Sequence, residues 1–344
     1  MGGSFLYYTI KDTDIPLDIT LGDICNIFEA SQTSTIRCLK LIHKSIENTM
    51  NNTDIIDFQS RFTKDFISWS NKHPEIAKDE EKLKQAALLA QAKWYAGSKK
   101  WLDGLSPNEY FYHIGDAKIY VSMFVKYIEE DIYIPDPLIE CLIDGGDEVY
   151  NILINIINIE NSKDITPDAL SDVRAEIISI IEEMQRDHPY SRYISLMLEI
   201  EEPCKLSEAI SYALESAEEI DYVKELLYSA YPISSNYAKM LVLDLLCSMP
   251  DEDERTADLV LAELNANSDV ELGILAGYEA ILMDERSLPL LKAYIEDPDI
   301  DYFTYTQLRY AIEAITGDLM DEKDFSGDAD YEKIANLKEE DIFG

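Results

Sequence analysis

Apolar residues recur at steps of three and four along most of the chain, which is the spacing of one face of an α-helix. In the first third this pattern covers 23–50, 54–72 and 73–102, and Gly97 is expected to end the last of these helices. Residues 1–22 instead alternate β-branched and aromatic side chains and predict a short strand or an extended arm. The pattern therefore favours helices almost throughout.

Helix-start signals divide the rest of the chain. Ser106 followed by proline and, three residues later, by Glu109 predicts a capping box, and Thr166 before a proline predicts another helix start. After residue 130 the chain reads as helical segments joined by short connections, as expected for antiparallel neighbours. The predicted fold is all-α: a helical N-terminal domain over 1–130, a helical series over 131–318 and an acidic cap or tail over 319–344.

Two segments of this series begin with the same triplet, Asp-Glu-Arg, at Asp253 and again 31 residues later at Asp284. Superposing the triplets aligns apolar positions in register, for example Val260 with Leu291. A period of this length is typical of stacked helical hairpins, because one hairpin cannot bury its apolar face alone. The alternative is that two unrelated helices share a start triplet by chance.

The stretch 308–318, LRYAIEAITGD, adds a motif to this periodicity. Its apolar, basic, small and glycine positions are Leu308, Arg309, Ala311, Ile312, Ala314, Ile315 and Gly317. The pattern resembles the first helix of a HEAT-type repeat, and the resemblance covers about 131–318. It implies a HEAT-like α-solenoid of stacked antiparallel helix pairs. The His-Glu pairs of HEAT-like hydroxylases are absent from the sequence, and the basic face of HEAT-like DNA glycosylases is replaced by the opposite charge.

Charge is distributed very unevenly. The chain carries a net charge of −39, of which 1–130 contributes −3 and 131–344 contributes −36. So negative a surface should repel nucleic acid and anionic membranes, whose binding requires lysine and arginine, and should attract basic proteins. The alternative is that the acidity only keeps the protein soluble. We expect a basic protein partner, with no direct nucleic acid and no membrane; the oligomeric state stays open.

Cysteine usage and the lack of a long apolar run predict a cytoplasmic protein. The five cysteines are widely spaced and odd in number, as expected for reduced thiols: Cys25, Cys38, Cys141, Cys204 and Cys247. The longest apolar stretch, 149–159, is shorter than a membrane helix and is interrupted by asparagines. The first residues lack the basic region of a signal peptide.

No stretch of the sequence carries a defensible catalytic, metal or cofactor motif. The four histidines, His43, His73, His113 and His188, do not pair with each other or with cysteine at metal-ligand spacing. The acidic stretch 324–332 has its glycine and final glutamate at the wrong positions for a calcium loop. Nucleotide-binding glycine motifs and nucleophile elbows are also absent from the sequence. We therefore expect no enzyme activity, no metal and no cofactor.

The candidate partner-binding residues are acids and tyrosines of the acidic region. They are Glu215, Glu218, Glu219, Tyr222, Glu225, Asp251, Glu252, Asp253, Glu254, Tyr302 and Tyr305. The acids of 215–225 lie at near-helical steps, so they could form a row facing a cationic partner. Tyrosines are favoured interface anchors, and those of 302–310 cannot all point inward on one helix. The alternatives are a solvated helix face for the acids and helix-core packing for most tyrosines.

The function expected from these observations is a non-enzymatic interaction module. Its acidic solenoid would bind a basic protein as an inhibitor, an immunity protein or an adaptor, for example by occupying a nucleic-acid-binding groove. The alternative is an enzyme with its site in the N-terminal domain. There the residues Trp94, Tyr95, Lys99, Lys100, Trp101 and His113 cluster along the sequence, and the two lysines could bind a phosphate. An amphipathic helix hairpin with an aromatic core would explain the same residues.

Overall fold

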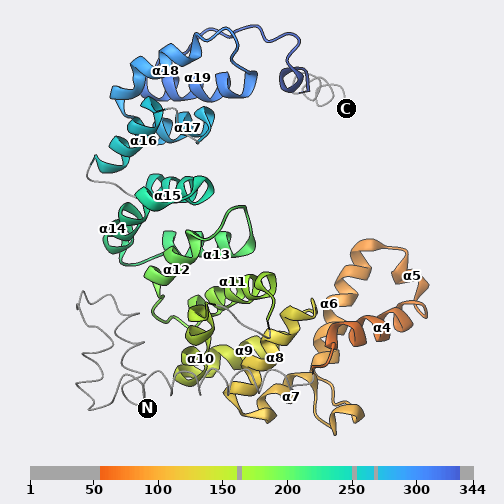
Figure 1. Cartoon of the computed structure of the whole chain (residues 1–344). Helices are drawn as coiled ribbons and strands as arrows, with labels where there is room; N and C mark the ends of the chain where they lie inside the picture. Colours follow the sequence, from red (N-terminus) through yellow and green to blue (C-terminus); the bar gives the residue numbers. More distant parts are fainter. Residues whose placement is uncertain (1–54, 161–164, 250–253, 267–269, 334–344) are drawn as a thin grey trace, which may run out of the picture. The chain divides into compact units, whose positions relative to one another are not determined.

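The structure is a computed structural model that describes residues 55–160, 165–249, 254–266 and 270–333. Every regular element in these ranges is a helix, and none of the described residues lies in a strand. The all-α prediction is therefore confirmed for this part of the chain (Figure 1). The predicted arm at 1–22 and the predicted helix at 23–50 lie outside the described residues.

The chain divides into two compact units, which we describe separately. Unit 1 comprises 1–193 and 204–213, and unit 2 comprises 194–203 and 214–344. The helices of unit 1 are α4 (Phe58–Ser70), α5 (Pro74–Ala77), α6 (Glu80–Ala96), η1 (Lys100–Leu102), α7 (Pro107–Ile114), α8 (Ala117–Glu129), α9 (Asp136–Asp144), α10 (Gly146–Asn158) and α11 (Pro167–Glu183). Helices α12 (Tyr190–Met197) and α13 (Lys205–Glu215) each contribute residues to both units.

The first helices of unit 1 begin and end at capping residues. Asp57 accepts a hydrogen bond from the Ser60 amide, so α4 begins later than predicted. The predicted helix over 73–102 is divided, because Asp79 caps α6 after the short α5. Gly97 follows the last residue of α6, as predicted. Local capping chemistry thus sets the helix ends more finely than the apolar pattern does.

The core of unit 1 forms where α8 packs against α9, α10 and α11. Phe124 and Tyr127 of α8 are fully buried, and the Tyr127 hydroxyl donates to the Ile56 carbonyl at 2.7 Å. The predicted capping box is present at the start of α7, where the Ser106 amide and the Glu109 side chain bond at 2.8 Å. Thr166 caps α11 as predicted.

The division between the units lies within the segment predicted as a single solenoid. Helix α8 belongs to the predicted N-terminal domain, yet it shares its core with helices beyond residue 130. The reason is that the middle of α8 is buried all round, at the consecutive positions 120–125, so the helix needs neighbours on several sides. The increase in negative charge after residue 130 therefore does not mark the boundary between the two packed units.

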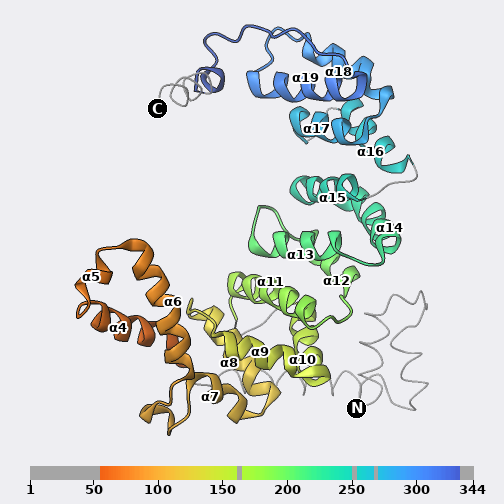
Figure 2. The same ribbon diagram turned by 180° about the vertical axis from the view of Figure 1, so that it is seen from behind.

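Unit 2 is a succession of helices in which neighbours along the chain pack on one another (Figures 1 and 2). The helices are α14 (Ile220–Ala230), η2 (Tyr231–Ile233), α15 (Asn236–Ser248), α16 (Arg255–Asn265), α17 (Leu272–Leu282), η3 (Glu285–Ser287), α18 (Leu288–Ile295) and α19 (Tyr302–Thr316). Helix α19 packs against both α17 and α18, and α15 packs against α14, α16 and α17.

The two Asp-Glu-Arg segments share their pattern of burial. Val260 and Leu291 are both fully buried, and Leu264 and Ile295 are both nearly so. Their helix starts differ, however. Arg255 of the first triplet is already the first residue of α16, whereas the second triplet passes through the 3-10 turn η3 before α18 begins. The 31-residue register thus holds for the packed positions and not for the first turn.

Helix α19 and the segment after it close the described part of unit 2. Asp301 caps α19 by accepting from the Thr304 amide at 2.8 Å, and Gly317 ends the helix with a left-handed backbone. Phe325, in the segment predicted as a cap or tail, is buried against Tyr302 and Tyr305. Up to residue 333 this segment therefore includes a part that packs on α19.

The described helices include none that is both long enough and apolar enough to cross a membrane. The described cysteines, Cys141, Cys204 and Cys247, are free thiols, and the first and last of these are buried.

Candidate partner-binding surface

The acids of 215–225 do not form one row along a helix. Glu215 is the last residue of α13, Glu218 and Glu219 lie in the connection, and Glu225 lies on α14. The chain turns at Ala217, which is buried, and a new helix starts at Ile220. The expectation of a single helical row is therefore wrong. Glu218 and Glu219 are exposed next to the start of α14, where negative charge also favours the helix dipole.

Glu225 is engaged within unit 2. Its carboxylate lies 2.7 Å from the Arg255 guanidinium at the start of α16. The same guanidinium lies 4.1 Å from the centre of the Tyr228 ring, and the Tyr228 hydroxyl bonds the Thr256 hydroxyl at 2.8 Å. The first Asp-Glu-Arg triplet thus ties α16 to α14 through its arginine. Tyr222, another predicted contact residue, is half-buried on α14.

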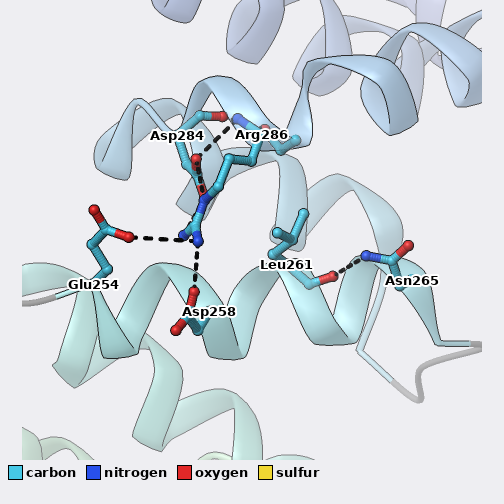
Figure 3. Close-up of polar contacts among 7 residues, drawn as sticks. Glu254, Asp258, Leu261, Asn265, Asp284 and Arg286 are labelled. Carbon is cyan, nitrogen blue, oxygen red and sulfur yellow. Dashed lines mark hydrogen bonds and ion pairs between the residues drawn. The ribbon is translucent and has the colours of Figure 1, made fainter.

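The arginine of the second triplet, Arg286, contacts Asp284 of its own triplet and two carboxylates at the start of α16, Glu254 and Asp258 (Figure 3). Its Nε lies 2.9 Å from Asp284 Oδ1, its Nη1 lies 2.7 Å from Asp258 Oδ1, and Glu254 Oε2 is 3.6 Å away. Burial raises the pKa of Asp284, but its hydrogen bonds with Arg286 together outweigh this and lower the pKa below its usual value. Three carboxylates therefore share one cation.

The remaining predicted residues divide between exposed, packed and undescribed positions. Asp251, Glu252 and Asp253 lie outside the described residues, and the Glu215 carboxylate accepts a 3.5 Å hydrogen bond from Ser248. Tyr305 is buried, and its hydroxyl donates to the Asp321 carbonyl at 3.0 Å.

The aromatic residues of α19 do point in different directions, as predicted. Tyr302 is half-buried, and its ring contacts Phe325 and Tyr331. Phe303 and Tyr310 are instead the exposed aromatics of this helix. Tyr305 is therefore part of the packing of unit 2, and the aromatic surface of α19 is formed by residues other than those selected from the sequence.

Two acids of unit 2 point into the packed helices rather than into solvent. Glu263 accepts from the Tyr231 hydroxyl and lies 3.2 Å from Lys239 Nζ. Glu279 on α17 is fully buried, and neither of its carboxylate oxygens has a hydrogen-bond partner among the described residues. Burial raises the pKa of Glu279 to about 7. These side chains carry part of the acidic composition but present no charge to a partner.

A pocket that sequence reasoning missed lies in unit 1, between α11 and α13. It has a volume of about 460 Å³ and is lined by carboxylates and an exposed tyrosine, among them Glu176, Glu183, Glu208 and Tyr212. Glu176 and Glu183 lie seven residues apart, and Glu208 and Tyr212 lie four apart, so each pair was expected on one face of its helix. The sequence gave no indication that the two helix faces meet, because residues 184–204 separate α11 from α13.

In the alternative N-terminal site, the aromatic residues and Lys99 contact neighbouring side chains of unit 1. Lys99 Nζ lies 4.2 Å from the Trp94 ring centre, and burial lowers the pKa of Lys99. Trp94 donates to Asp65 at 2.8 Å, whereas Lys100 in η1 and His113 on α7 are both exposed. These contacts account for the aromatic residues through packing and provide no reacting constellation.

No group of metal-binding side chains occurs within the described ranges. His188 of unit 1 is buried, bonds the Tyr193 hydroxyl at 3.1 Å and contacts Glu182 at 2.9 Å. Burial lowers the pKa of His188 and so favours the neutral ring, although Glu182 opposes this shift.

Comparison with known proteins yields no relative. No protein-family model matches the chain, and neither a curated protein nor a solved structure matches it at the significance required.

Proposed function

We propose that the protein is a non-enzymatic interaction module whose acidic surface binds a basic protein or a basic protein surface. The supporting observation is that four cations of unit 2 pair with acids of the same unit. Arg255, Arg286, Arg309 and Lys239 each form an ion pair inside the unit. Many more carboxylates are exposed than these cations neutralise, so the net charge of the acidic region resides on its surface.

We further propose that unit 2 is built from stacked helix pairs of HEAT-like type. Four side-chain contacts between helices join residues 28 to 32 positions apart, close to the 31-residue spacing of the triplets. They involve Tyr228, Tyr231, Arg286 and Tyr294. Recurrent contacts at one separation are expected when each repeat touches only its neighbours. The equal burial of the aligned apolar positions supports the same arrangement.

The role proposed for the module is to neutralise or regulate a basic target in a reducing cytoplasm. It would act as an inhibitor, an immunity protein or an adaptor. An anionic surface of this kind can occupy a groove that otherwise binds nucleic acid, because both present closely spaced negative charges. The cytoplasmic setting rests on the free cysteines.

The proposal is tested by capture of partners from the cell of origin. The full chain is immobilised, extract is applied at about 50 mM salt, and bound proteins are eluted with increasing salt and identified. We expect basic proteins that elute at moderate salt, because screening weakens attraction between exposed charges. The purified partner should then bind about tenfold more weakly for a two- to threefold rise in salt.

Recovery of partners that are not basic, or a complex whose affinity does not change with salt, would contradict the proposal. A matched pair of variants gives the control. Glu218→Gln with Glu219→Gln removes two exposed carboxylates of the candidate surface, whereas Glu130→Gln with Glu160→Gln removes two from unit 1. Only the first pair should weaken binding.

A further inference from the structure

The pocket between α11 and α13 has an apolar interior. Ala175 and Ile178 of α11 and Ala213 of α13 line it and are almost completely buried, and Ala209 lies beside them. Small side chains at three of these four positions leave the space unfilled, which accounts for a volume of about 460 Å³. An apolar interior of this size can accommodate the aliphatic part of a long side chain.

The rim of the pocket is negatively charged, and ion pairs within unit 1 neutralise only part of this charge. It carries four carboxylates and the single cation Lys205, whose Nζ is directed toward Asp172 at 3.8 Å. Glu182 contacts His188, but Glu176, Glu183 and Glu208 take part in none of the ion pairs found among the described residues of unit 1. These three charges are available to a cationic ligand.

An aromatic ring completes the lining. Tyr212 on α13 is 64% exposed although it borders the pocket. The face of an aromatic ring attracts a guanidinium or ammonium group, and the attraction increases when carboxylates lie nearby. Arginine satisfies both requirements better than lysine, because its planar fork can bond a carboxylate while it stacks on a ring.

We propose that this groove, defined by Glu176, Glu183, Glu208 and Tyr212, is the docking site for an arginine-bearing segment of the basic partner. The aliphatic stems of the arginines lie over the apolar interior, and the guanidinium groups bond the carboxylates and stack on Tyr212. Complementary charge selects this occupant. The inference rests on the proposed function and assigns part of the binding to unit 1, where none of the individual candidate residues selected from the sequence lies.

The experiment uses the full-length chain and a short fluorescein-labelled peptide of alternating arginine and alanine, with binding followed by fluorescence anisotropy at about 50 mM salt. The triple variant Glu176→Gln, Glu183→Gln, Glu208→Gln should bind the peptide about tenfold more weakly, from roughly twofold for each carboxylate removed. The control variant Glu130→Gln, Glu148→Gln, Glu160→Gln carries the same change in net charge on exposed residues outside the groove. It should change the affinity less than twofold, as expected for exposed charges that do not contact the ligand.

The tyrosine provides a second, uncharged readout. Tyr212→Ala should weaken the peptide severalfold, whereas Tyr212→Phe keeps the ring and should bind like the parent. Tyr310→Ala removes a similarly exposed ring outside the groove, at 62% exposure, and should have no effect. Far-UV circular dichroism of each variant shows that the fold is retained.

The possible outcomes distinguish a failure of the proposed groove from a failure of the proposed function. If the unmodified chain binds the peptide and both triple variants bind it equally well, the groove is overturned while the proposed function stands. A chain that does not bind the peptide at all counts against both. A dimer in sedimentation that only the groove variant abolishes would show a second copy of the chain as the occupant, and would also overturn the inference.

Discussion

The groove of unit 1 and the α14–α16–η3 face of unit 2 are both rich in carboxylates, yet they differ in whether cationic side chains pair with those carboxylates. In unit 2, Arg255 and Arg286 reach back to acids on an earlier helix, so part of the negative charge stabilises the fold. In the groove, Glu176, Glu183 and Glu208 have no such partner among the described residues. The number of acids in a segment is therefore a poor measure of the charge that it offers to a ligand.

Glu279 is the extreme case in this comparison, because it is neither exposed nor paired. Its pKa is about 7 in the folded chain and near 4.5 when unfolded. Folding is thus favoured by its protonated form at low pH, and this contribution is lost as pH rises through about 7. The pKa difference corresponds to roughly 3 kcal/mol.

We expect Glu279→Gln to be more stable than the parent by up to roughly 3 kcal/mol at about pH 8, and not at about pH 4. The free energy of unfolding in urea, measured across this range, checks the prediction. Asp284 adds to the raised pKa, while Ser287 and Arg286 oppose it. An identical pH dependence in parent and variant would show that Glu279 is solvated rather than buried.

The second largest effect is expected at the internal acid Glu263. Tyr231→Phe removes the hydroxyl that donates to this carboxylate and leaves Lys239 as its partner. Loss of a hydrogen bond to a charged group at a buried position should lower the free energy of unfolding by about 1.5 kcal/mol. Tyr310→Phe, at an exposed position, is the control and should be neutral. If both variants were as stable as the parent, the hydrogen bond from Tyr231 to Glu263 would not contribute to the stability of the fold.

A smaller effect should follow from releasing the carboxylates held by Arg286. Arg286→Gln leaves Asp258, Asp284 and Glu254 without their shared cation, so a purified basic partner that contacts this face of unit 2 should bind about two- to threefold more tightly. Anisotropy titration measures this. Arg286 also lowers the pKa of Asp284, and the stability gained in this way is lost as pH falls through that pKa. The variant should therefore lose less stability in acid than the parent, and unchanged binding and acid response would refute the arrangement.

The smallest effect is expected at Arg255, which pairs with Glu225 where both side chains are exposed to solvent. Arg255→Gln should strengthen binding of the same basic partner by less than twofold. Arg255→Lys keeps the charge but not the planar contact with Tyr228, and should bind that partner as the parent does. A larger effect of Arg255→Gln than of Arg286→Gln would show that the carboxylates around Arg286 are not the ones that the partner contacts.

The elements that could be predicted from sequence are those whose causes are local. The capping box at Ser106, the cap at Thr166 and the stop at Gly97 depend on a few adjacent residues, and all are present. The apolar register shared by α16 and α18 was also visible, because burial follows the spacing of apolar side chains. The splitting of the helix at Asp79 was missed, since helix-forming residues on both sides masked one cap.

The candidate surface was harder to predict, because charge pairing joins residues far apart in the sequence. Glu225 and Arg255 lie 30 positions apart, and nothing in the local pattern of either indicates their contact. Tyr305 and Phe303 are two residues apart, yet one is buried and the other exposed. The choice depends on where the segment after α19 packs.

The amino-acid sequence by itself determined that the chain is helical, where many of its helices start and stop, and the sign and distribution of its charge, because these follow from neighbouring side chains and composition. The tertiary structure alone decided which acids are paired, which are buried and which remain open to a ligand. The reason is physical: an ion pair or a desolvated carboxylate depends on distances of a few ångströms between helices, and only packing sets those distances.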